Sequence, residues 1–163
     1  MRIRNFMRTA GIGASMALML GGAAIATDLP ISATITNTCS IGTVTALSFT
    51  YDPVVANATT DAHSTGSIAV TCTTGDSGAL VGLGLGGQPT GSQRYMSDGP
   101  ATLAYNLYSD SGYSTAWDDS TNKVTAPTGT GLPQTLTVYG SIPQAQNKPA
   151  GSYTDTVTID VTP

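Results

Sequence analysis

The fold class of this chain follows from a short alternating segment, Ser67-Ile68-Ala69-Val70-Thr71-Cys72-Thr73. Successive side chains of a β-strand point to opposite faces, so Ile68, Val70 and Cys72 share one apolar face of such a strand. The same period of two returns at residues 29–35, 79–85, 103–108, 135–142 and 153–161. Together with a less regular strand within residues 41–49, this pattern predicts about seven half-buried strands.

The segments between these strands are rich in Gly, Pro, Asp and Ser, which favour turns. They lie at residues 51–64, 86–93, 109–131 and 143–151. The chain contains no Glu and few Lys or Arg, so several of the best helix-forming residues are nearly absent. Short alternating strands separated by turns predict an all-β chain, folded as one immunoglobulin-like β-sandwich.

The N-terminus begins with three basic residues, followed by an apolar, Gly-rich run without charge. The small residues of Ala24-Ile25-Ala26 then resemble the site that a signal peptidase reads. A membrane anchor would need an apolar segment of about 20 residues, and this run is shorter. The sequence therefore predicts a signal peptide at residues 1–26 and a mature β-sandwich domain at residues 27–163.

The charge of the mature chain excludes one class of function. Removal of the signal peptide leaves three Lys and Arg residues against ten Asp residues, a net charge of −7. Proteins that bind nucleic acid need a basic patch to neutralise phosphates. We therefore expect no nucleic-acid partner, and an acidic surface that keeps an exported protein soluble.

The mature chain contains two cysteines, Cys39 and Cys72. An even number of cysteines behind a signal peptide is typical of a disulfide formed in an oxidising compartment. A zinc site is disfavoured because the chain has one His. A Cys39–Cys72 disulfide closes a loop of about 34 residues, which stabilises a fold by roughly 3–4 kcal/mol in the loop-entropy treatment.

Candidate catalytic groups are few. The single His, His63, lies in a polar segment where a solvent-exposed loop side chain is expected. Cysteines joined in a disulfide cannot act as nucleophiles. Asp118 and Asp119 are adjacent, so they point apart on an extended segment and do not form the carboxylate pair of a glycoside hydrolase. We expect no catalytic residue and no enzyme activity.

Ligand-binding motifs are equally weak. Residues 82–87 match the G-x-G-x-x-G pattern, but Gln88-Pro89 follows and cannot open the helix that dinucleotide binding requires. Asp110, Asp118 and Asp119 miss the spacing of an EF-hand calcium loop. The sequence therefore predicts no metal site, no cofactor and no small-molecule substrate.

A set of short motifs occurs in a fixed order along the mature chain. After Cys39 they read Phe49-Thr50-Tyr51-Asp52, Gly66-Ser67-Ile68-Ala69-Val70-Thr71-Cys72, Arg94-Tyr95-Met96, Leu103-Ala104-Tyr105-Asn106-Leu107-Tyr108, Trp117 and Gly151-Ser152-Tyr153-Thr154-Asp155-Thr156-Val157. This ordered set resembles the spore coat protein U domain family, which includes the subunits of archaic chaperone–usher pili. Two departures concern turns: Phe49-Thr50 stands where members often carry Phe-Gly, and Trp117-Asp118 where they often carry Trp-Gly.

The resemblance implies an incomplete sandwich that lacks its last strand and exposes a hydrophobic groove. A periplasmic chaperone would fill this groove first, and the N-terminal segment of another copy or a related pilus subunit would replace it at the outer-membrane usher. The chain would then be a structural subunit of a cell-surface fibre that supports adhesion or biofilm formation. The alternative is a secreted coat or matrix protein of the same fold that does not polymerise.

The segment just after the predicted cleavage site has the cleanest alternation in the chain. Its apolar residues, Leu29, Ile31, Ala33 and Ile35, would enter the groove of a neighbouring subunit by β-strand addition. Pro30 lacks an N–H, so it must lie at an edge or at the start of the paired strand. Residues 29–35 could instead be the first strand of the chain's own sandwich, and the sequence leaves both interpretations open.

Overall fold

The computed structural model describes residues 26–163, and every regular element in this part of the chain is a β-strand. The predicted signal peptide at residues 1–26 lies outside the described residues, apart from Ala26. By its contacts the chain divides into two units, Met1–Thr34 and Ile35–Pro163, and all eight strands belong to the second. No helix in the described residues has the length and apolar character that crossing a membrane requires.

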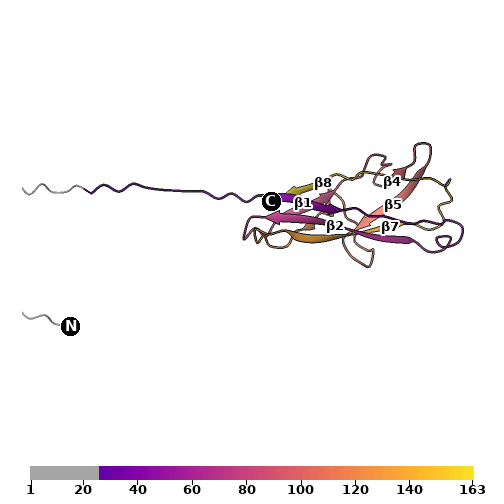
Figure 1. The fold of residues 1–163 in the computed structure, drawn as a ribbon, viewed down its shortest axis with the longest axis horizontal. Coiled ribbons are helices and arrows are strands. Elements are labelled where there is room, and N and C mark those ends of the chain that lie inside the picture. Colours follow the sequence, from indigo (N-terminus) through magenta and orange to yellow (C-terminus); the bar gives the residue numbers. More distant parts are fainter. Residues whose placement is uncertain (1–25) are drawn as a thin grey trace, which may run out of the picture. The chain divides into compact units, whose positions relative to one another are not determined.

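The larger sheet has five antiparallel strands in the order β1-β2-β7-β5-β4. Their bounds are Cys39–Thr45 for β1, Ala62–Cys72 for β2, Gln134–Ile142 for β7, Thr102–Tyr108 for β5 and Arg94–Ser97 for β4. The long strands β2 and β7 lie side by side at its centre (Figure 1), paired from Ala62↔Ile142 to Val70↔Gln134.

The smaller sheet has three antiparallel strands in the order β6-β3-β8. Their bounds are Val124–Thr125 for β6, Leu80–Leu83 for β3 and Ile159–Thr162 for β8. After β2 the chain passes from one sheet to the other at every connection except the one between β4 and β5, which pair with each other in the larger sheet. The disulfide-linked strand β1 lies at one edge of the larger sheet, and the C-terminal strand β8 lies at one edge of the smaller sheet.

The hydrophobic core contains the apolar faces that the alternation predicts. Buried side chains come from β2, β3, β5 and β7, and include Ile68, Val70, Val81, Leu83, Leu103, Leu107 and Val138. Trp117, in the connection between β5 and β6, is only 1% exposed. Its indole nitrogen donates a 2.9 Å hydrogen bond to the Val81 carbonyl, which satisfies the one polar atom of this core side chain.

The predicted all-β fold class is confirmed, with differences in detail. The structure has eight strands rather than about seven, because the short strands β4 and β6 fall inside segments that lack clear alternation. The predicted strand at residues 153–161 is formed only from Ile159 onward. Residues 29–35 form no strand in the structure.

Candidate strand-binding groove

Two extended segments of the domain have the side-chain pattern of a strand without being assigned to one. Residues 46–51 follow β1, and their odd-numbered side chains Leu47, Phe49 and Tyr51 are half-buried while the residues between them are exposed. Residues 152–158 precede β8 and alternate in the same way, with Tyr153 and Val157 half-buried. Each segment thus presents an apolar face that the domain covers incompletely.

Backbone pairing of these segments is sparse. Thr154 forms an isolated bridge with Ser97 of β4, and the Thr158 carbonyl accepts a 2.8 Å hydrogen bond from the Gly84 N–H. On the other segment, the Ser48 N–H donates to the Ser64 hydroxyl at 3.2 Å. Backbone groups at an uncovered sheet edge form a ready template for an added strand.

Two adjoining hollows open between the segments. The first has a volume of about 310 Å³ and reaches the core residues Ile68, Leu83, Leu107 and Val138. The second has a volume of about 770 Å³ and runs on along Tyr51, Leu103 and Tyr153. Leu47, Phe49 and Met96 line both hollows, and the two adjoining hollows together are called the groove below.

One wall of the groove is fixed by a carboxylate. Asp155 accepts a 2.6 Å hydrogen bond from the Tyr105 hydroxyl through Oδ2, and bonds from the N–H groups of Gly87 and Thr156, each 2.8 Å, through Oδ1. Burial raises the pKa of Tyr105 well above its usual range, and the bond to Asp155 adds to this shift. The hydroxyl therefore stays protonated and holds the segment before β8 against β5.

A buried arginine joins the two sheets behind the groove. Arg94 of β4 is 6% exposed, and its guanidinium donates to the carbonyls of Leu83, Gly84 and Trp117 at 2.6, 2.9 and 2.9 Å. Burial lowers its pKa, although a guanidinium remains charged in proteins. Met96, two residues further along the same anchored strand β4, lines the groove.

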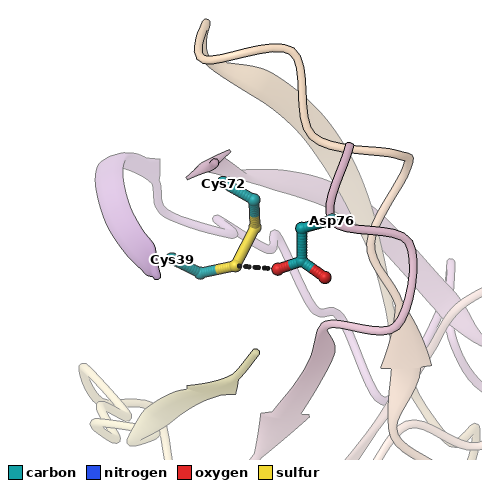
Figure 2. A group of neighbouring side chains, drawn as sticks. All are labelled: Cys39, Cys72 and Asp76. Atoms are coloured by element: carbon teal, nitrogen blue, oxygen red, sulfur yellow. Dashed lines mark hydrogen bonds between the residues drawn. A yellow bond between two sulfur atoms is a disulfide. The ribbon is translucent and has the colours of Figure 1, made fainter. Parts of the chain in front are cut away.

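The predicted disulfide is present. Cys39 and Cys72 face each other where β1 begins and β2 ends, and their sulfurs are bonded. Figure 2 shows Asp76 beside this bridge, with Oδ2 3.3 Å from the Cys39 sulfur. A disulfide sulfur carries no proton to donate and is not a thiolate, so this cluster is a polar contact to the bridge and not a metal site.

The other titratable residues considered from the sequence lie away from the groove. His63 stacks on Tyr113 with ring centroids 3.9 Å apart. Asp118 accepts backbone N–H bonds from Asn122, Ser120 and Thr121. The bonds from Asn122 and Ser120 hold the pKa of its carboxyl well below its usual range. Asp118 therefore stabilises a turn between β5 and β6.

The four residues predicted to enter a neighbour's groove are solvent-exposed. Leu29, Ile31 and Ile35 are 83%, 89% and 86% exposed, and Ala33 is exposed too. The groove-lining residues were not singled out from the sequence. The signal for them was nevertheless present, because Phe49, Met96, Tyr105 and Asp155 all belong to the motifs of the family resemblance.

Comparison with known proteins decides the family. A sequence model of the Spore Coat Protein U domain matches residues 25–160. The chain belongs to the spore coat protein U domain family. The resemblance drawn from the ordered motifs is therefore confirmed. Protein U of Myxococcus xanthus is 38% identical to this family member over 149 residues, which cover 83% of each protein.

A solved structure supports the same fold. The spore coat protein U domain resembles a chain in the CsuC–CsuE chaperone–tip adhesion subunit pre-assembly complex from archaic chaperone–usher Csu pili of Acinetobacter baumannii. The TM-score is 0.58 at 23% identity, and the match covers 78% of this chain and 40% of that chain. The likeness confirms the predicted immunoglobulin-like β-sandwich.

Proposed function

We propose that the chain is a structural subunit of a secreted chaperone–usher pilus, assembled by donor-strand exchange. The observation that carries this proposal is the groove between residues 46–51 and 152–158, two alternating segments that lack a strand between them. A strand inserted there covers the half-buried side chains of both segments and pairs with their backbones. Insertion would complete the sandwich.

The occupant is the N-terminal segment of a second copy or of a related subunit. Leu29, Ile31, Ala33 and Ile35 alternate with polar residues and are exposed, so their side chains are free to enter apolar pockets while the backbone forms ladder bonds. Burial of Leu29 and the two Ile contributes on the order of 5–8 kcal/mol before the cost of ordering the segment. A chain with both groove and donor segment fits a position within a fibre.

Assembly by this route needs partners that protect the groove before exchange. An exposed apolar groove with uncovered strand edges promotes aggregation, so a periplasmic chaperone covers it during export and an outer-membrane usher exchanges the chaperone for the next subunit. The chain of similar fold comes from a chaperone–tip adhesion subunit pre-assembly complex, which supports a chaperone as a partner. The fibre would extend from the cell surface and support adhesion or biofilm formation.

A second candidate function is a secreted coat or matrix protein that does not polymerise. The family description, Spore Coat Protein U domain, favours it, and Protein U of Myxococcus xanthus matches the chain over most of its length at 38% identity. The two functions differ in the groove. A coat protein of this kind folds as a stable monomer without a chaperone, whereas a pilus subunit expressed alone is degraded, aggregated or self-associated.

The test uses a labelled peptide with the sequence of residues 27–37, called the donor peptide. The oxidised mature chain is diluted from denaturant into this peptide, and binding is followed by fluorescence anisotropy. We expect saturable binding that raises the yield of monomeric folded chain. A matched peptide with Asp at positions 31 and 35 serves as control. Equal binding of both peptides, or of neither, would overturn the proposal.

A further inference from the structure

Two glycines interrupt the apolar face of the larger sheet beneath the groove. Gly66 of β2 and Gly140 of β7 are buried, at positions where the alternation of each strand would otherwise place a core side chain. In the β2–β7 ladder they are near neighbours, because Gly66 pairs with Val138 and Gly140 pairs with Ser64. The sheet therefore has a notch on its inner face.

Two side chains of the groove wall occupy this notch. A Cβ atom added to Gly140 would lie 2.7 Å from Cζ of Phe49 and would overlap Cδ2 of Leu47. A Cβ atom added to Gly66 would lie 2.9 Å from Cδ1 of Leu47 and 2.6 Å from the Thr45 carbonyl oxygen. Carbon atoms in contact are ordinarily about 3.5–4.0 Å apart, so neither position can take a side chain unless its neighbours shift.

The same two side chains line both hollows of the groove. Their height above the sheet therefore sets the depth that remains for an inserted strand. Because both positions are Gly, the side chains of Leu47 and Phe49 pack directly against the backbone of β2 and β7. A methyl group at position 140 would lift them toward the space that an incoming side chain needs, since packed interiors leave little room for adjustment.

We propose that Gly66 and Gly140 are positioning residues for strand insertion, because they seat Leu47 and Phe49 low enough for the donor side chains to enter. This inference rests on the proposed function of the groove. Its consequence is a subunit whose affinity for the donor segment depends on two residues that the donor does not contact. The depth of the notch would also help to select which donor side chains fit above Leu47 and Phe49.

The experiment compares Gly140→Ala with Gly42→Ala, a matched substitution in β1. A Cβ atom at position 42 meets Ala69 at 3.6 Å, an ordinary contact. Both variants are made in the full mature chain and tested for binding of the donor peptide. We expect Gly140→Ala to weaken binding on the order of tenfold or more. Gly42→Ala should bind within about twofold of the unsubstituted chain, since a surface change of this kind has little energetic effect.

A compensating variant separates positioning from general damage to the sheet. Leu47→Ala removes the side chain that meets a methyl group at position 140 and leaves space into which the ring of Phe49 can shift. Gly140→Ala combined with Leu47→Ala should therefore fold and bind the peptide no more weakly than Leu47→Ala alone. Additive losses in the double variant, or failure of the double variant to fold, would show that the glycine serves the sheet itself and would overturn the inference.

The outcomes also distinguish this inference from the function on which it rests. If the unsubstituted chain does not bind the donor peptide, the proposed function fails whatever the glycine variants do. If the unsubstituted chain binds and folded Gly140→Ala binds equally well, the proposed function stands and the positioning role is wrong. If Gly140→Ala fails to fold but the double variant folds and binds, the clash with Leu47 is the cause and the inference is supported.

Discussion

The hydroxyl of Tyr105 donates a 2.6 Å hydrogen bond to Oδ2 of Asp155 and thereby joins the middle of β5 to the segment that precedes β8. Tyr105 is 5% exposed and belongs to the core, whereas Asp155 lies on a segment that no strand covers. The bond therefore transmits the rigidity of the core to one wall of the groove. Two predictions follow from this pair.

Removal of the Tyr105 hydroxyl should loosen this wall. In Tyr105→Phe the Asp155 carboxylate loses a short donor, and hydrogen bonds to charged groups contribute about 1.5–3 kcal/mol. Because Asp155 is partly exposed and water can replace the donor, we expect a loss of about 1–2 kcal/mol in the free energy of unfolding. Urea denaturation measures it. Tyr153→Phe is the matched control, since its hydroxyl bonds to the exposed Pro149 carbonyl. Equal losses would contradict the role assigned to Tyr105.

The alkaline stability of the domain should also depend on Tyr105. Burial and the bond to Asp155 raise the pKa of this phenol in the folded state above its ordinary value. The folded state therefore keeps a proton that the unfolded state releases above pH of about 10. Stability is fully present below that pH and falls as the pH rises beyond it. Unfolding free energies measured between pH 8 and 11 should fall less steeply for Tyr105→Phe than for the unsubstituted chain. Parallel slopes would show that this hydroxyl titrates normally.

The disulfide should contribute much of the stability of the mature domain. It joins residues 33 positions apart at the outer end of the β1–β2 pair, and a loop of this size gives roughly 3–4 kcal/mol. We expect Cys39→Ser with Cys72→Ser to lower the free energy of unfolding by about this amount. Alkylation and non-reducing mass spectrometry of exported protein should find no free thiol. Two alkylated cysteines in periplasmic material would contradict formation of the bridge during export.

The strands that could be predicted well from the sequence are those in which apolar residues alternate with polar ones and point into the core. Ile68 and Val70 of β2 and Leu103 and Leu107 of β5 belong to this class, because a period of two specifies both strand and buried face. Strand β4 was not predicted, because its buried side chain is the charged Arg94 rather than an apolar residue. The burial of Arg94 depends on carbonyl groups of Leu83, Gly84 and Trp117, which only the folded chain brings together.

The groove was harder to predict than the strands. Its floor and walls come from Leu47, Phe49, Met96 and Val157, residues on segments far apart in the sequence. Alternation identified residues 153–161 as strand-like but gave no information about which neighbour would pair with them. Depth in the groove depends on Gly66 and Gly140, whose packing against Leu47 follows from the register of β2 on β7. Register and inter-sheet packing are not encoded in local periodicity.

The donor assignment predicts a separation between folding and polymerisation. In Ile31→Asp, a charge replaces one of the side chains proposed to enter the neighbour's groove, and burial of an unpaired carboxylate is costly. We expect this variant to remain folded when held by its chaperone and to accept the donor peptide in its own groove, while fibre formation is lost. Electron microscopy and size-exclusion chromatography measure polymerisation, and peptide anisotropy measures the groove.

Ser32→Asp provides the matched control, because position 32 lies on the opposite face of the same segment and receives the same charge. The donor assignment predicts that Ser32→Asp still forms fibres, since its side chain points away from the groove. The competing interpretation makes residues 29–35 the first strand of the chain's own sandwich. Under it, Ile31→Asp and Ile35→Asp would each destroy the folded, chaperone-held subunit, because both charges would enter its own core. Loss of that subunit in both variants would therefore reject the donor assignment, whereas folded subunits that no longer polymerise would support it.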